Sequence, residues 1–249
     1  MVAESDARTS LLGRRRLMEL GTAVAGGGTI AAMNVATAAM AADELPISPP
    51  EDLMREHGVL KRALLVYREV IARIERGDDV PRHELGGAAS VIRSLIHDHH
   101  EHVEERYLFS VLLRANRMTS TVEVLRSQHE AGRMLTSVLL TVDNTRGAFD
   151  RRARQELVET MAAFIRMYEP HEAREDTEVF PAFRAIMPPQ TFADLSERLR
   201  EEEYRRFGPM GFSRYVRRIA DIEKSLGINE LAQFTPTVPV ARQAAGGPA

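Results

Sequence analysis

The sequence predicts an all-α protein: an up-down-up-down four-helix bundle followed by two additional C-terminal helices. Helix-forming residues dominate the 249-residue chain, which contains no Trp and no Cys. Apolar residues recur at helical spacing over four long segments. The connections between these segments are short, and short connections place consecutive helices antiparallel and side by side in a bundle.

The first two predicted helices span about residues 50–76 and 81–115. The run Ser48-Pro49-Pro50-Glu51 is typical of a helix start, since Ser caps the backbone, Pro fits the first turn and an acidic residue suits the N-terminus. The run Gly77-Asp78-Asp79-Val80-Pro81 then separates the two helices.

The third and fourth predicted helices span about residues 121–144 and 149–187, with a turn at Gly147. Pro170 lies inside the fourth helix. Because Pro removes one backbone hydrogen bond, we expect a bend just before His171. Two shorter helices are expected after Pro188-Pro189, over about residues 190–206 and 209–226.

The N-terminal segment resembles a twin-arginine export signal. Arg14-Arg15-Arg16-Leu17-Met18 is followed by a stretch rich in Ala, Gly, Thr and Val that runs to Ala42. The resemblance implies passage through the twin-arginine translocation machinery, which carries folded proteins, and therefore an exported protein. The alternative is a disordered or membrane-anchoring N-terminus. Accumulation of the full-length chain in the cytoplasm would contradict export.

These patterns divide the chain into four segments. Residues 1–42 form the export-signal segment, 43–188 the bundle, 189–228 a C-terminal helical extension and 229–249 a tail. The tail is rich in Ala, Gly, Pro and Gln, and we expect it to be disordered.

Charge and cysteine content exclude several classes of function. The formal net charge is −3, so we expect no nucleic-acid partner. The absence of Cys excludes disulfides, thiolate-zinc sites and iron–sulfur clusters.

A motif that combines His and Glu occurs twice. His100-Glu101-His102-Val103-Glu104-Glu105-Arg106-Tyr107-Leu108-Phe109 is matched, 71 positions later, by His171-Glu172-Ala173-Arg174-Glu175-Asp176-Thr177-Glu178-Val179-Phe180. Both read His-x-x-x-Glu-acidic-x-x-aliphatic-Phe. Four residues advance a helix by about 400°, so His and Glu of each copy lie one turn apart and within reach of one ion.

Two more histidines occupy matching places in the other two helices. His57 precedes His100 by 43 residues and His129 precedes His171 by 42, so the bundle reads as two related helical hairpins. His57 and His100 are each about 27–29 Å from the turn between their helices, and hence lie at nearly the same level. Four imidazoles and two carboxylates suit first-row ions, iron above all, with manganese possible. Open coordination positions would bind dioxygen, peroxide, nitric oxide or water.

The predicted helices resemble a hemerythrin-like HHE cation-binding domain over about residues 50–185. The doubled His-x-x-x-Glu motif with its trailing Phe carries the resemblance. It implies a bundle of hemerythrin type and two iron ions bridged by the carboxylates. The ligands that it implies are His57, His100, Glu104, His129, His171 and Glu175.

Two positions depart from the pattern of the oxygen-carrying hemerythrins. They have a second His one turn after the third-helix His, where this chain has Arg133. This puts reversible oxygen carriage in doubt, and a nearby guanidinium would favour bound anions. They also place an Asp five residues after the last His, and here both Glu175 and Asp176 are available. We favour Glu175 because a step of five residues turns about 140° away from the His.

These residues predict a non-haem di-iron protein that binds or senses dioxygen or related small oxidants, or handles iron. The first alternative is a di-iron oxidative or peroxide-consuming enzyme. The second is a helical regulatory or scaffolding protein without metal. The Glu-x-x-His motif of ferritin-like bundles and the His-Glu-x-x-His motif of zinc proteases are both absent.

Other polar residues near the motifs carry less weight. His97 is expected to extend the inward face, and its counterpart Tyr168 to be a core aromatic or, as the alternative, a redox relay. The remaining histidines, His83, His99 and His102, are expected to face solvent. Solvated ion pairs are expected for Glu101, Glu105, Glu172 and Arg174.

Overall fold

The computed structural model describes residues 48–145 and 147–237, which contain helices and their connections and no strand. This confirms the predicted all-α class. The predicted export signal lies outside these residues, as does most of the predicted tail. Within the tail, Leu231–Phe234 forms a short 3-10 turn.

The first helix, α2, runs from Pro49 to Arg76. It starts where the sequence predicts, and the backbone N–H of Ser48 donates to Glu51 Oε2 (3.4 Å). It ends at Gly77, whose φ of 86° is a left-handed conformation that favours glycine.

The second rod is continuous in direction but not in helix type. It consists of α3 (Arg82–Val91), a π segment (Ile92–His100), α4 (Glu101–Val103), a second π segment (Glu104–Phe109) and α5 (Ser110–Arg114). The wide turns of π helices are rare in proteins, and those that do occur are often found at functional sites. Here they contain His100 and Glu104.

The second hairpin repeats this construction. The third rod is α6 (Thr119–Leu140). The fourth consists of α7 (Arg151–Arg174), a π segment (Glu175–Val179) and α8 (Phe180–Ile186), with Pro170 inside α7. In both copies of the motif, therefore, a π segment begins at the Glu of His-x-x-x-Glu.

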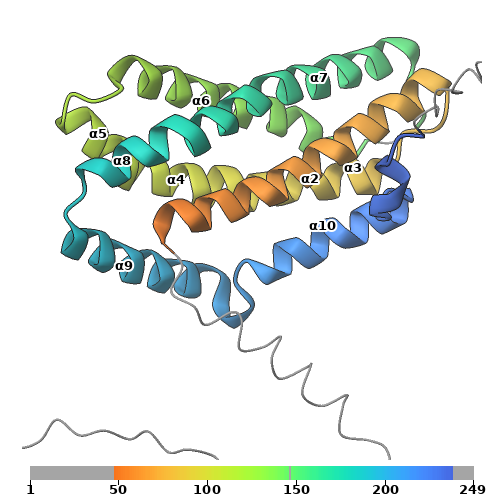
Figure 1. Ribbon diagram of the computed structural model, residues 1–249. Helices are drawn as coiled ribbons and strands as arrows, with labels where there is room; N and C mark the ends of the chain where they lie inside the picture. Colours follow the sequence, from red (N-terminus) through yellow and green to blue (C-terminus); the bar gives the residue numbers. More distant parts are fainter. Residues whose placement is uncertain (1–47, 146, 238–249) are drawn as a thin grey trace, which may run out of the picture. The chain divides into compact units, whose positions relative to one another are not determined.

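The rods pack as a helical bundle (Figure 1). Helix α2 contacts α3 and α7, and α6 contacts the same two helices, so the four rods surround a common interior. Two further helices, α9 (Pro189–Phe207) and α10 (Ser213–Leu226), follow. Helix α10 packs against α2 and α3, and α9 packs against α2.

The apolar core is divided in two. One cluster, which includes Leu64, Ile92 and Phe164, lies toward one end of the rods. The other, which includes Phe109, Val122 and Phe183, lies toward the other end. The buried His and Glu residues of the motifs belong to neither cluster. Apolar packing on both sides therefore holds the helices together around a polar interior.

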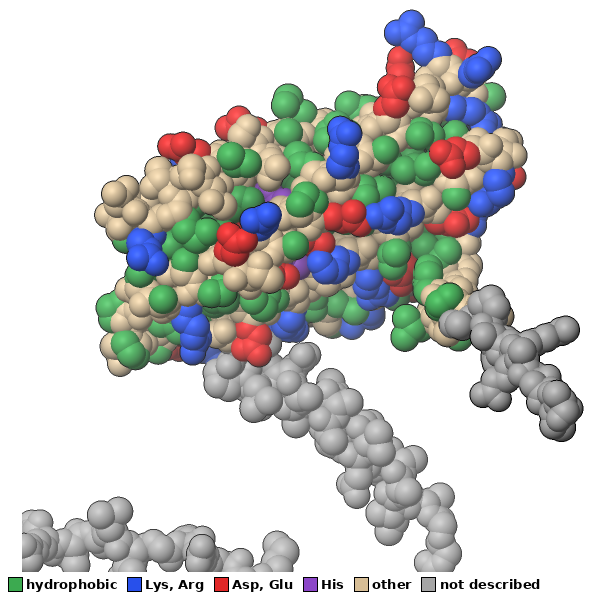
Figure 2. Space-filling view, turned by 45° about the horizontal axis from the view of Figure 1, so that its top comes forward, with side chains coloured by type: hydrophobic (Ala, Val, Ile, Leu, Met, Phe, Trp, Pro, Cys, Tyr) green, Lys and Arg blue, Asp and Glu red, His purple; other side chains and the backbone are tan. Residues whose placement is uncertain are grey.

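The face drawn in Figure 2 shows acidic, basic and apolar side chains interspersed, with only small areas of histidine visible. None of the helices in the described part of the chain has the length and apolar character that crossing a membrane requires.

A substitution at Gly132 would test how tightly α6 packs against the fourth rod. A methyl group there would lie 2.8 Å from two ring carbons of Tyr168, and closer still to its hydroxyl. Gly132→Ala should therefore lower the free energy of unfolding by about 1–3 kcal/mol, as overpacking does. Urea unfolding of the metal-free protein measures this.

The matched control is Gly58→Ala, since Gly58 is helical and exposed, with nothing within 4 Å of an added methyl. It should be neutral or raise stability by up to about 1 kcal/mol. Equal effects of the two substitutions would contradict the packing account.

Candidate metal centre

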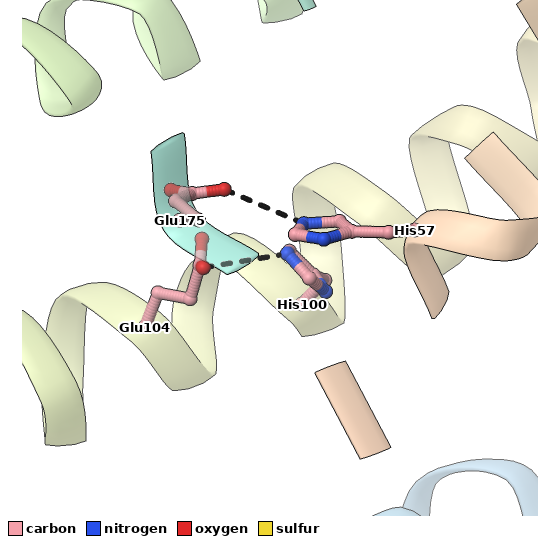
Figure 3. Close-up of side chains that lie close together, drawn as sticks. All are labelled: His57, His100, Glu104 and Glu175. Atoms are coloured by element: carbon pink, nitrogen blue, oxygen red, sulfur yellow. Dashed lines mark ion pairs between the residues drawn. The ribbon is translucent and has the colours of Figure 1, made fainter. Parts of the chain in front are cut away.

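Six side chains converge between the two apolar clusters. His57, His100, His129 and His171 come from the four rods, and Glu104 and Glu175 are the first residues of the π segments Glu104–Phe109 and Glu175–Val179. All six are buried, and the two glutamates are fully so. Ligand atoms of His57, His100, Glu104 and Glu175 lie within 4.8 Å of one another, and so do those of His129, His171 and Glu175. Figure 3 shows the first group.

The carboxylates of Glu104 and Glu175 each direct one oxygen toward the His57–His100 pair and the other oxygen toward the His129–His171 pair. Glu104 Oε1 lies 3.4 Å from His100 Nε2, and Glu104 Oε2 lies 3.4 Å from His129 Nε2. Glu175 Oε2 lies 3.4 Å from His57 Nε2, and Glu175 Oε1 lies 3.1 Å from His171 Nε2. Both carboxylates are thus placed to bridge two ions.

The spacings fit ligands of a shared ion. Imidazole nitrogens and carboxylate oxygens lie about 2.0–2.2 Å from zinc, a typical first-row ion. Two such ligands at bond angles of ~90–110° are therefore about 2.8–3.6 Å apart. The four Nε2–carboxylate distances, 3.1–3.4 Å, fall inside this range.

The other nitrogen of each imidazole is held by a hydrogen bond. In each case the Nδ1–H donates to an oxygen of a neighbouring side chain. The pairs are His57 to Asp176 Oδ1 (2.8 Å), His100 to Glu56 Oε2 (2.8 Å), His129 to Glu105 Oε1 (2.9 Å) and His171 to Gln128 Oε1 (2.8 Å). An acceptor at Nδ1 leaves the Nε2 lone pair of a neutral imidazole directed at the centre. Metal-binding histidines almost always have such a partner.

These partners follow the internal repeat of the chain. Glu56 and Gln128 directly precede the histidines of the first and third rods, and each accepts from the next rod. Glu105 and Asp176 directly follow the bridging glutamates, and each accepts from the other hairpin.

The trailing Phe of each motif also crosses between hairpins. Phe180 stacks on His57 with ring centroids 5.8 Å apart, and Phe109 stacks on His129 at 5.7 Å. These contacts explain why both copies of the motif end in Phe.

The buried carboxylates are incomplete without cations. Both oxygens of Glu104 and of Glu175, and Nε2 of His129, are buried and have no hydrogen-bond partner among the described residues. Burying a carboxylate costs several kcal/mol unless it is compensated. Divalent cations between the carboxylates and the imidazoles would supply that compensation, so the donor set fits a pair of metal ions.

Without metal, protons partly take the place of cations. Burial opposes the charged form of His57, but its hydrogen bond to Asp176 and the nearby negative charge of Glu175 raise its pKa to about 9. Burial likewise opposes charge on His129, but the nearby negative charge of Glu104 and a hydrogen bond to Glu105 raise its pKa to about 10. Burial raises the pKa of Glu104, but the imidazoles of His100 and His129 together outweigh this effect and hold that pKa well below its usual range.

The structure separates Glu175 from Asp176. Glu175 is fully buried and faces His57 and His171, whereas Asp176 is partly exposed and accepts the Nδ1–H of His57. Arg133 lies 2.9 Å from Glu101 Oε2 and 2.7 Å from Glu105 Oε1. Its guanidinium therefore pairs with carboxylates, and this leaves little positive charge to attract a bound anion.

Three of the residues expected to be solvated are buried. His99 is only 4% exposed because Phe207, at the end of α9, packs edge-on against its ring. Glu101 accepts from His97 Nδ1 (2.7 Å) and from the Tyr168 hydroxyl (2.7 Å), and Glu172 pairs with Lys61. Tertiary contacts thus cover positions that helical periodicity alone assigned to solvent.

Other expectations for the polar residues agree with the structure. His97 is buried and its Nε2 accepts from the Thr136 hydroxyl (2.8 Å), while His83 and His102 are exposed. Tyr168 is a buried core aromatic stacked on Phe164.

Comparison with known proteins agrees with this geometry. The sequence profile described as the hemerythrin HHE cation binding domain matches residues 48–183, more than half of the chain. The chain belongs to the hemerythrin HHE family. The match covers all six converging side chains and the four rods except the last three residues of α8.

Close relatives occur in mycobacteria. Uncharacterized protein Rv1995 of Mycobacterium tuberculosis and Uncharacterized protein Mb2018 of Mycobacterium bovis are each 47% identical over 234 residues, which is 91% of this chain and 92% of the relative. No solved structure gives a significant match.

The pKa shifts predict a pH dependence for the metal-free protein. A group whose pKa is raised by folding stabilises the folded state fully below its unfolded value, near 6.5 for His, and loses this effect as pH rises through the folded value. His57 and His129 titrate near pH 9 and 10 in the folded chain. The free energy of unfolding should therefore fall between about pH 7 and pH 10.

Urea unfolding across this interval measures the effect. The metal-loaded protein is the control, because its imidazoles are already neutral ligands and should contribute a much smaller decrease. Parallel pH profiles with and without metal would contradict the assignment.

Proposed function

We propose that this protein is a non-haem di-iron protein of hemerythrin type, an up-down-up-down bundle that holds two iron ions in the centre described above. The observation that carries the proposal is the pair of buried carboxylates without hydrogen bonds, each turned toward imidazoles of both hairpins. The donor set, four imidazoles and two carboxylates, suits iron, and manganese, which binds carboxylates, is possible.

We also propose that the bound pair interacts with dioxygen, peroxide or a related small oxidant. Two imidazoles and two bridging carboxylate oxygens per ion leave coordination positions open, and open positions on iron supply redox and ligand-binding chemistry. The protein's own residues exclude bulk water, since all six donors are buried. Export through the twin-arginine route remains part of the proposal and is supported by the N-terminal sequence.

Replacing a donor should abolish the pair. The parent chain should contain about two irons per molecule, and His57→Ala, His100→Ala or His171→Ala should contain far less, because each removes one donor from a compact set. Metal analysis after gel filtration measures this.

His102→Ala is the matched control. It lies in the same rod as His100 but is exposed, and it should keep the parent metal content. Parent-like iron in the three donor variants would contradict the proposed ligand set.

Exposure to oxidants distinguishes the proposed function from its alternatives. If the pair binds oxidants, the protein loaded anaerobically with iron(II) should develop a visible absorption band in air, and loss of that band on deoxygenation would indicate reversible binding. Bleaching with consumption of added peroxide would instead indicate an enzyme. A metal-loaded protein without any spectral response would contradict oxidant binding, and a protein that takes up no metal would favour the scaffolding alternative.

A further inference from the structure

We propose that the two metal positions are inequivalent: the position between His57 and His100 (position 1) holds its ion tightly, and the position between His129 and His171 (position 2) holds an exchangeable ion. Glu56 and Gln128 act as positioning residues that set this difference. The inference rests on the proposed di-metal function, and it adds a prediction of which of the two ions is released first.

The first observation is the compactness of the donor sets. At position 1, both histidines and both bridging glutamates lie within 4.8 Å of one another. At position 2, only His129, His171 and Glu175 meet that limit, although Glu104 still faces His129 at 3.4 Å. The donor set of position 2 is therefore the less compact of the two, and His129 Nε2 lies 4.0 Å from Glu175 Oε1.

The second observation is the charge of the Nδ1 acceptors. At position 1 both acceptors are carboxylates, Glu56 and Asp176. At position 2 one acceptor is the neutral amide of Gln128. The other, Glu105, also accepts from Arg133 (2.7 Å), which draws negative charge away from His129. The internal repeat aligns Glu56 with Gln128, so this is a difference between otherwise equivalent places.

The other polar groups around these acceptors are also placed by the structure, and Glu56 Oε1 lies 3.5 Å from Nε2 of the buried His99. Glu101 and Glu172 each follow a ligand histidine, and neither forms a hydrogen bond with a ligand imidazole. Glu101 pairs with Arg133 and Glu172 pairs with Lys61. These two cations occupy equivalent positions in the internal repeat, four residues after His129 and His57.

A carboxylate that accepts from Nδ1–H makes the imidazole a stronger donor at Nε2 than a neutral amide does. Two strengthened donors at position 1 favour retention of its ion. Loss of such a partner typically costs 10–100-fold in metal affinity. We therefore expect the two ions to differ in release rate by roughly that factor.

The experiment follows iron release from the full chain. Protein loaded anaerobically with two equivalents of iron(II) is mixed at pH 8 with an excess of a colorimetric iron(II) chelator. The parent should release one ion in a fast phase and one in a slow phase. Gln128→Glu should slow the fast phase by about 10–100-fold, and Glu56→Gln should accelerate the slow phase by a similar factor.

The substitutions are isosteric, and each makes one position resemble the other. The exchange variant Glu56→Gln/Gln128→Glu should again give two phases, which a merely structural role of either residue would not produce. Circular dichroism of the metal-free variants verifies that each has folded.

The outcomes separate this inference from the function it rests on. Two ions that leave in one phase, or a fast phase unaffected by Gln128→Glu, would overturn the inequivalence and leave the di-metal function standing. A parent chain that takes up no pair of ions would overturn both.

Discussion

The structure depends on two ionised carboxylates buried in the middle of a helical bundle. Glu104 and Glu175 are fully buried and accept no hydrogen bond from the described residues, and apolar packing cannot compensate their charge. Cations or protons must do so. The imidazoles from all four rods surround them for this reason, and the apolar core is split so that this polar layer fits between its two halves. A bundle that needed only stability would fill this layer with apolar side chains.

Widened helical turns place the glutamates. In both hairpins a π segment begins at the Glu of the motif, and the apolar residues after it return to the core, among them Phe109 and Phe180. The same turns carry the neighbouring acids, Glu105 and Asp176, to the opposite hairpin, where they accept from imidazoles. One local irregularity thus positions an inward-facing carboxylate, the acid that orients a histidine, and the aromatic ring that stacks on that histidine.

Much of this could be predicted from the sequence because helices obey simple geometry. Spacing along the chain gives the height and direction of a side chain, so the convergence of the six donors follows from the repeated motif and the short connections. The choice of Glu175 over Asp176 as the inward residue follows in the same way. The partners of each Nδ1 could not be named, since they depend on rotation and tilt between rods. The burial of His99 could not be predicted either, because it is caused by Phe207 from a distant helix.

The exchange of acids between hairpins has a consequence for biosynthesis. The first hairpin contains His57 and His100, but the acid that holds His57 and the second bridging carboxylate both come from the final rod. A nascent chain that has released only its first half from the ribosome therefore presents two imidazoles and one carboxylate, with Glu56 to orient His100 but without the acid that orients His57. The group of His57, His100, Glu104 and Glu175 is therefore complete only after the fourth rod has folded against the first.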